Sequence, residues 1–89
     1  MKVLKFGAAW CSACLLMQPV WEAIEKERPW LKNEYYDYDE QQALVASYEV
    51  NNKLPTFIFL DKQGQEFLRL HGEPSKAELL KIIEENKDR

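Results

Sequence analysis

Short apolar runs alternate with longer stretches of helical spacing along this chain. The short runs predict β-strands at residues 2–7, 33–38, 56–60 and 65–70. The third run, Thr-Phe-Ile-Phe-Leu, is the strongest strand signal in the chain. The sequence Asp-Lys-Gln-Gly at 61–64 predicts a turn, so the last two strands are expected to form a hairpin.

Helical periodicity appears in three stretches: about 11–28, about 40–50, and a segment that starts at residue 75. Pro19 falls inside the first helix, and Pro29 ends it. The residues of this helix that are expected to face the core recur at helical spacing: Leu16, Met17, Val20, Trp21 and Ile24.

Polar residues mark the starts of the other two helices. Asp39 is expected to cap the second helix, with Gln42 reaching back as in a capping box. Ser75 and Glu78 form the same pattern at the start of the last helix. The residues of the second helix that are expected to face inward are Ala43, Leu44, Ala46 and Val50.

The element order is therefore βαβαββα, which predicts an α/β fold. Because helices join the first three strands, we expect these strands to run parallel wherever they are neighbours. No repeat, linker or low-complexity segment interrupts the order. The 89 residues are thus expected to form a single domain, 1–89.

Composition and charge narrow the function classes. Twelve basic and fifteen acidic side chains give a net charge of -3. This balance argues against nucleic acid or an anionic membrane as the main partner. No apolar run approaches the ~20 residues of a membrane span, and the first residues lack a signal-peptide pattern. The expected location is therefore the cytoplasm.

The segment Trp10-Cys11-Ser12-Ala13-Cys14 holds both cysteines of the chain. It lies between the first predicted strand and the first predicted helix, where free N–H groups and the helix dipole stabilise a thiolate. A Cys-x-x-Cys at such a junction is typical of a redox site, with Cys11 as the nucleophile and Cys14 as the resolving thiol. The alternatives are an inert buried pair and a metal cluster shared between two chains. Two cysteines and one distant histidine, His71, are too few for a closed zinc site in one chain, so no metal is expected.

Trp10-Cys-x-x-Cys after the first strand, together with Leu54-Pro55-Thr56 before the third, resembles the thioredoxin family. The similarity covers nearly the whole chain. Further residues that match the family motifs are Phe6, Ala8, Pro19, Gly64 and Gly72. The resemblance implies a thioredoxin-like four-stranded mixed sheet flanked by three helices, without the family's usual first strand and helix. The protein is expected to be a monomer. The tyrosine strand would be an exposed edge, with association through Tyr35, Tyr36 and Tyr38 as the alternative.

The resemblance also assigns roles near the cysteines. Pro55 would be a cis-proline that packs against the disulfide and presents the Leu54 backbone, next to Thr56, to an extended substrate. The alternative is an ordinary trans-proline at a strand start. Trp10 would shape the rim of the substrate site, or else simply cover the helix start. The only redox group implied is the Cys11–Cys14 disulfide, with no separate cofactor.

Two positions depart from the family pattern. Ser12-Ala13 stands where general thioredoxins carry Gly-Pro, a dipeptide that tunes the reduction potential. The Ser12 hydroxyl could donate a hydrogen bond to the Cys11 sulfur. Lys5 stands where thioredoxins bury an aspartate that helps to deprotonate the second cysteine. Three roles are open for Lys5: reaching to the surface, pairing with Asp37 or Tyr35, or acting as a buried base that tunes Cys14.

These features predict a thiol–disulfide oxidoreductase that reduces disulfides in protein substrates. A separate reductase would have to reduce the Cys11–Cys14 disulfide after each reaction, because the chain is too short to bind NADPH itself. One alternative is a disulfide oxidant or isomerase. The other is a binding module with a vestigial or regulatory cysteine pair, whose tyrosine edge engages a partner.

Overall fold

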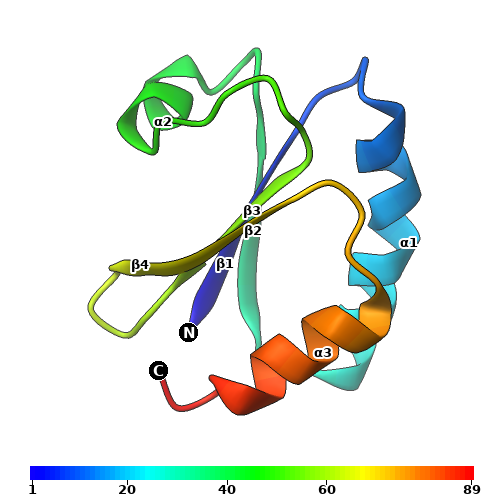
Figure 1. Cartoon of the computed structure of the whole chain (residues 1–89), viewed down its shortest axis with the longest axis vertical. Helices are drawn as coiled ribbons and strands as arrows, with labels where there is room; N and C mark the ends of the chain where they lie inside the picture. Colours follow the sequence, from blue (N-terminus) through cyan, green and yellow to red (C-terminus); the bar gives the residue numbers. More distant parts are fainter.

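The computed structural model describes residues 1–89 and has the predicted order of elements. The sheet contains four strands in the order β2-β1-β3-β4. Helices α1 and α3 lie on one side of this sheet and α2 lies on the other (Figure 1). The elements are β1 (Lys2–Gly7), α1 (Ser12–Glu27), β2 (Lys32–Asp37), α2 (Gln42–Ser47), β3 (Thr56–Leu60), β4 (Glu66–His71) and α3 (Lys76–Glu85). No helix combines the length and the apolar composition that a membrane crossing requires.

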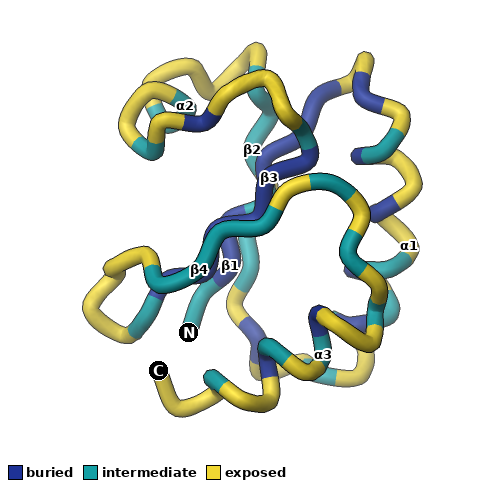
Figure 2. The backbone as a smooth tube through the Cα atoms, viewed as in Figure 1, coloured by how far each residue is buried: buried dark blue, intermediate teal, exposed yellow.

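The two central strands carry the core because both of their faces are covered. Successive side chains of a strand point to opposite faces, so Phe57 and Phe59 of β3 pack toward α1 and α3, while Ile58 packs toward α2. All five residues of β3 are buried. This double burial explains the strong apolar run at 56–60. Buried residues concentrate along β1 and β3, while the edge strands β2 and β4 are only partly covered (Figure 2).

Strand directions agree with expectation for two of the three strand pairs. Strand β1 is parallel to β2, and β3 is antiparallel to β4, as predicted. Strands β1 and β3, however, are antiparallel neighbours, so the prediction of a parallel pairing was wrong. Helix α1 has 16 residues and runs about 24 Å back along the sheet, which lets β2 start at the same end as β1. Helix α2 has only six residues and stays at the end where β2 finishes, so β3 starts there and runs back (Figure 1).

Helix α2 is shorter than predicted, and Asp39 does not cap it. The N-cap residue is Gln41, which makes no side-chain capping bond. The Gln42 side chain does reach back, donating to the Asp39 carbonyl at 3.2 Å. The carboxylate of Asp37 accepts from the backbone N–H groups of Asp39 and Glu40, at 2.9 and 3.1 Å. The chain is therefore turned by Asp37 before the helix begins.

Two of the four residues expected to face inward from the second helix do not do so. Ala43 and Ala46 are exposed. Val50 is buried, as predicted. The helix and its end also cover the α2 side of the core with three partly buried side chains: Leu44, Val45 and Tyr48.

Helix α1 matches its predicted range within one residue at each end, but one core assignment was wrong. Leu16 is 62% exposed, and the buried row instead begins two residues earlier, at Cys14. The buried residues of this helix are Cys14, Met17, Trp21 and Ile24. The inward face of α1 thus runs directly from the second cysteine into the core, leaving Leu16 beside it at the surface.

The last helix starts as predicted. The Ser75 hydroxyl accepts from the Glu78 N–H at 3.1 Å, and the Glu78 carboxylate accepts from the Ser75 N–H at 3.5 Å. This capping box directs Leu79 and Ile83 of α3 into the core, where both are fully buried.

Candidate functional site

The two cysteines lie at the junction of β1 and α1 and form a disulfide, with Cα atoms 5.3 Å apart. Cys11 is the N-cap residue of α1, and its backbone is extended there. Its sulfur accepts a hydrogen bond from the Cys14 N–H at 3.2 Å. Both residues are buried within a small cluster with Ala8. The sequence prediction of a cysteine at the free N–H groups of a new helix is therefore confirmed.

This position favours negative charge on the Cys11 sulfur. The first N–H groups of a helix have no partner within the helix, and the dipole adds a partial positive charge there. No acidic residue lies in the first turn of α1 to oppose this effect. Cysteine thiols at helix N-termini generally have a pKa below the ordinary value of about 8.5. The arrangement can therefore supply an activated nucleophile, with the second thiol within bonding reach.

The side chains of the dipeptide between the cysteines make no hydrogen bond to either sulfur. The Ser12 hydroxyl forms no hydrogen bond within the chain, so the bond to the Cys11 sulfur comes from the Cys14 backbone instead. Ser12 is exposed and Ala13 is partly buried against the cysteine cluster. Ser12 is thus free to face solvent or a bound partner.

The segment before β3 packs against the cysteines. The Leu54–Pro55 peptide bond is cis, as the family resemblance implied. The Leu54 side chain packs on the cluster of Ala8, Cys11 and Cys14. The Leu54 N–H donates to the Asn52 carbonyl at 3.1 Å, whereas its own carbonyl accepts no hydrogen bond within the chain. That carbonyl remains available to an incoming backbone N–H.

Trp10 lies at the surface beside the disulfide and is 58% exposed. Its indole N–H donates to the Asp39 carboxylate at 2.8 Å, and its ring meets Tyr38 edge-on, with ring centroids 6.3 Å apart. Asp39, which was expected to cap a helix, therefore holds the indole instead. The prediction missed this contact because the two residues are 29 positions apart and no local pattern joins them.

Lys5 points from β1 toward α1, and its partner is not one of those expected. Its ammonium group lies 3.1 Å from the Glu25 carboxylate and 5.3 Å from the centroid of the Trp21 ring. Only 13% of the Lys5 side chain is exposed, which excludes a free reach to solvent. Tyr35 lies opposite Lys5 in the strand register, yet neither it nor Asp37 forms an ion pair or hydrogen bond with Lys5. Pairing with Asp37 or Tyr35, one of the three roles left open for Lys5, is therefore wrong.

A cavity of about 300 Å³ lies behind Cys14, between α1 and the sheet. Its polar walls come from β1, α1 and β2, and Pro55 lines it as well. A methyl group placed on Gly7 would meet the Tyr35 hydroxyl at 2.9 Å and the Cys14 sulfur at 3.2 Å. Only glycine at this position lets the phenol and the sulfur approach the same point. The polar lining residues are Lys5, Gln18, Glu22, Glu25 and Tyr35.

Tyr35 presents a protonated hydroxyl to this cavity. Burial raises the pKa of the Tyr35 phenol above its ordinary value, and the nearby charges of Asp37 and Glu40 raise it further. At neutral pH the group is therefore a hydrogen-bond donor. Tyr35 as a whole residue is 53% exposed, because it lies on the edge strand β2.

The other tyrosines of the predicted edge surface are partly buried. Tyr36 packs on Phe6, and its hydroxyl donates to Glu34, whereas Tyr38 packs on Trp10. Of the three, only Tyr35 is exposed. His71, the only histidine, contacts Thr56 and not the cysteines.

Comparisons with known proteins agree with this geometry. The family model described as Thioredoxin matches residues 1–85. Thioredoxin of Chlamydia trachomatis is 35% identical over 81 residues, covering 91% of this chain and 78% of the relative. The solved structure of Fasciola hepatica thioredoxin superposes with a TM-score of 0.85 at 33% identity, covering 96% of this chain and 79% of that one. For thioredoxin NaTrxh of Nicotiana alata the TM-score is 0.86 at 34% identity, with 96% and 71% covered.

Proposed function

This chain belongs to the thioredoxin family and is a thiol–disulfide oxidoreductase, and we propose that it works in the reducing direction on disulfides of protein substrates. The observation that carries the proposal is the cysteine pair at the start of α1, with Cys11 as the N-cap residue. The helix N–H groups and dipole favour a Cys11 thiolate, which is the species that attacks disulfides.

The reaction proceeds by two exchanges. The Cys11 thiolate attacks one sulfur of the substrate disulfide; that S–S bond breaks, a mixed disulfide forms, and the released substrate thiolate takes up a proton. The Cys14 thiol then loses its proton and attacks the Cys11 sulfur. The Cys11–Cys14 disulfide forms, and the second substrate sulfur leaves as a thiolate. Two electrons pass from the cysteine pair to the substrate.

The substrate is proposed to lie along the segment that precedes β3. The Leu54 carbonyl has no partner within the chain, so it can accept an N–H from an extended substrate in a short β-like pairing. Pro55 and Thr56 fix this segment against the sheet, since both are buried. Trp10, next to Cys11 in the chain, supplies an exposed aromatic rim, and its ring packs on Tyr38, which contacts the same cysteine cluster as Leu54.

Lys5 is proposed to tune the second exchange. It lines the same cavity as Cys14, and a positive charge nearby favours the thiolate that must form there. Glu25 holds the ammonium group in place. Lys5 thus acts on Cys14 through its charge.

A separate reductase would return electrons to the Cys11–Cys14 pair. The proposed location is the cytoplasm, where thiols are kept reduced and a Cys-x-x-Cys pair that donates electrons can be recharged.

Trapping the mixed disulfide tests the proposal. With insulin as the substrate, Cys14→Ser is expected to accumulate a covalent adduct that dithiothreitol releases, because the resolving thiol is missing. Cys11→Ser, the matched control, is expected to accumulate none. Accumulation in Cys11→Ser alone would assign the attack to Cys14, and no adduct in either variant would contradict the proposed reaction.

A further inference from the structure

The connection between α2 and β3 carries the Leu54–Pro55 segment, and between the buried Val50 and the packed Leu54 side chain its residues 51–53 hold it weakly. Asn51, Asn52 and Lys53 are exposed. Within the segment, the Lys53 N–H donates to the Asn51 side chain at 2.9 Å and the Leu54 N–H donates to the Asn52 carbonyl at 3.1 Å. A surface segment with so few contacts of its own needs outside anchors to keep a fixed shape.

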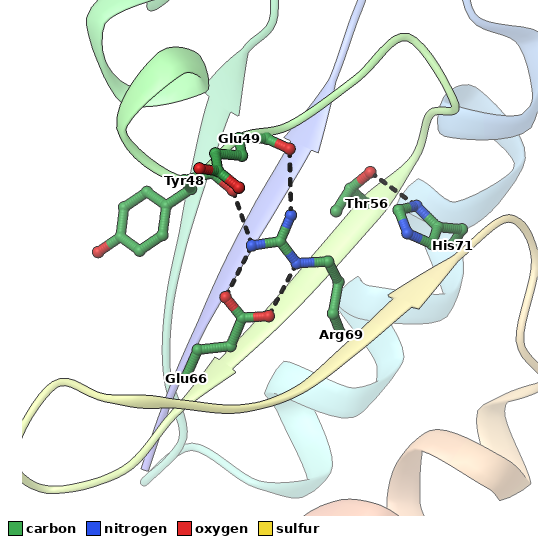
Figure 3. Close-up of polar contacts among 6 residues, drawn as sticks. All are labelled: Tyr48, Glu49, Thr56, Glu66, Arg69 and His71. Carbon is green, nitrogen blue, oxygen red and sulfur yellow. Dashed lines mark hydrogen bonds and ion pairs between the residues drawn. The ribbon is translucent and has the colours of Figure 1, made fainter.

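Arg69 of β4 anchors the start of this connection (Figure 3). Its guanidinium donates to the Tyr48 carbonyl at 2.7 Å and to the Glu49 carbonyl at 3.4 Å. Glu49 has a φ of 53°, a left-handed conformation that marks the reversal of the chain after α2. The Glu66 carboxylate accepts two further bonds from Arg69, at 2.7 and 2.8 Å, and so aims the guanidinium at these carbonyls.

His71 anchors the end of the same connection (Figure 3). Its Nδ1 lies 3.1 Å from the Thr56 hydroxyl oxygen and 3.3 Å from the Lys53 carbonyl oxygen. The hydroxyl of Thr56, which is fully buried, donates its one proton to the Lys53 carbonyl at 3.0 Å. With the hydroxyl proton used in this way, the tautomer that satisfies both contacts is the one that carries the hydrogen on Nδ1. The next residue, Gly72, adds a backbone bond from its N–H to the Pro55 carbonyl at 3.0 Å.

Arg69 and His71 are two residues apart on one strand, so their side chains share a face. From this face they reach both ends of a connection that has no regular structure between them. We propose that these two side chains are positioning residues: they hold the Leu54–Pro55 segment in the shape that binds substrate, without touching either cysteine. This inference rests on the proposed function, because it assumes that substrate binds along that segment.

The kinetic consequence is specific to extended substrates. A loosened segment binds a polypeptide backbone less well, but it leaves the Cys11 thiolate at the start of α1 unchanged. We therefore expect His71→Ala to raise the KM for insulin by about three- to tenfold, the effect of one lost hydrogen bond. The kcat for insulin and the rate with a small aromatic disulfide, which needs no backbone pairing, are expected to stay within about twofold of wild type.

Three further variants separate a positioning role from a general loss of stability. His71→Asn can place an amide N–H close to where Nδ1 lies, so it is expected to restore the wild-type KM. Arg28→Ala loses an ion pair with Glu84 on the far side of the molecule and serves as the control for lost stability without a loosened segment. It is expected to leave the KM for insulin unchanged. Arg69→Gln is expected to raise that KM, as His71→Ala does.

Hydrogen exchange at the Leu54 amide tests the anchoring without relying on any activity. Faster exchange at this amide in His71→Ala, but not in His71→Asn or Arg28→Ala, is the expected result. Unchanged exchange in His71→Ala would overturn the inference, as would an equal loss of rate with insulin and the small disulfide. If the wild-type protein fails to reduce insulin while the exchange result holds, the proposed function fails and the anchoring stands.

Discussion

The pair between Lys5 and Glu25 gives the sharpest test of the packing around the cysteines. Lys5 is nearly buried on a central strand, with 13% of its side chain exposed, and Glu25 is its only ion-pair partner. Glu25→Gln keeps the shape of the side chain but removes its charge. The ammonium group then stays close to the Trp21 ring without a counterion. We expect this variant to be less stable than wild type.

The size of the effect follows from the geometry. At 3.1 Å and an effective dielectric constant of about 20, the attraction between the two charges is about 5 kcal/mol. Desolvation of Lys5 offsets much of this, and Glu25 is screened because 40% of its side chain is exposed. Exposed pairs contribute about 0–1 kcal/mol, whereas breaking a buried pair costs about 3–5 kcal/mol. We therefore expect Glu25→Gln to lower the free energy of unfolding by about 1–2 kcal/mol.

Urea denaturation of the oxidised protein at pH 7 measures this change. Glu27→Gln is a matched control on the same helix, because Glu27 pairs with Lys76 at the surface, and it is expected to cost less than about 0.5 kcal/mol. In a Lys5→Met background, Glu25→Gln should cost equally little, since no charge remains to be paired. Equal losses for Glu25→Gln and Glu27→Gln, or no coupling between positions 5 and 25, would refute the reasoning.

Three other predictions concern the site and its supports. If Lys5 tunes Cys14, Lys5→Met should change the pH profile of the resolving step in single-turnover reduction; identical rates across pH would exclude that role. Trp10→Ala should lower kcat/KM for insulin by about tenfold while leaving the rate with a small disulfide nearly unchanged, and equal losses would contradict a substrate-rim role. The hydrogen bonds from Arg69 lower the pKa of Glu66, so its carboxylate stabilises the fold above the unfolded pKa of about 4.3 and loses that effect as pH falls through the lowered value. The difference in unfolding free energy between wild type and Glu66→Gln should thus be largest near pH 7 and shrink toward pH 3; a difference that does not change with pH would contradict this.

Local patterns predicted the elements that depend on local physics. The apolar run at 56–60 predicted a strand, and the structure has β3 there, with all of its residues buried. Ser75 and Glu78 predicted a helix start, and both hydrogen bonds of the capping box are present. Cys11 was placed at the first free N–H groups of α1 and is its N-cap residue. In each case the relevant partners lie within a few residues of one another in sequence.

The errors arise where distant residues decide the outcome. The direction of β3 depends on α2 staying at one end of the sheet, which helical periodicity does not reveal. Lys5 pairs with Glu25 of α1, 20 positions away in sequence. The Trp10 indole donates a hydrogen bond to Asp39, 29 positions away. Leu16 fits an apolar helical row but lies at the surface beside the cysteines. Such pairings depend on which faces meet in three dimensions.

The reduction potential of the Cys11–Cys14 pair tests the central claim most directly. Equilibration in glutathione or dithiothreitol buffers, followed through tryptophan fluorescence, gives this value, because the exposed Trp10 lies beside the disulfide. A protein that donates electrons to substrates in a reducing compartment should have a potential at or below about -220 to -260 mV. A potential near about -120 mV, typical of proteins that donate their disulfide, would contradict the proposed direction of electron flow and the cytoplasmic location with it.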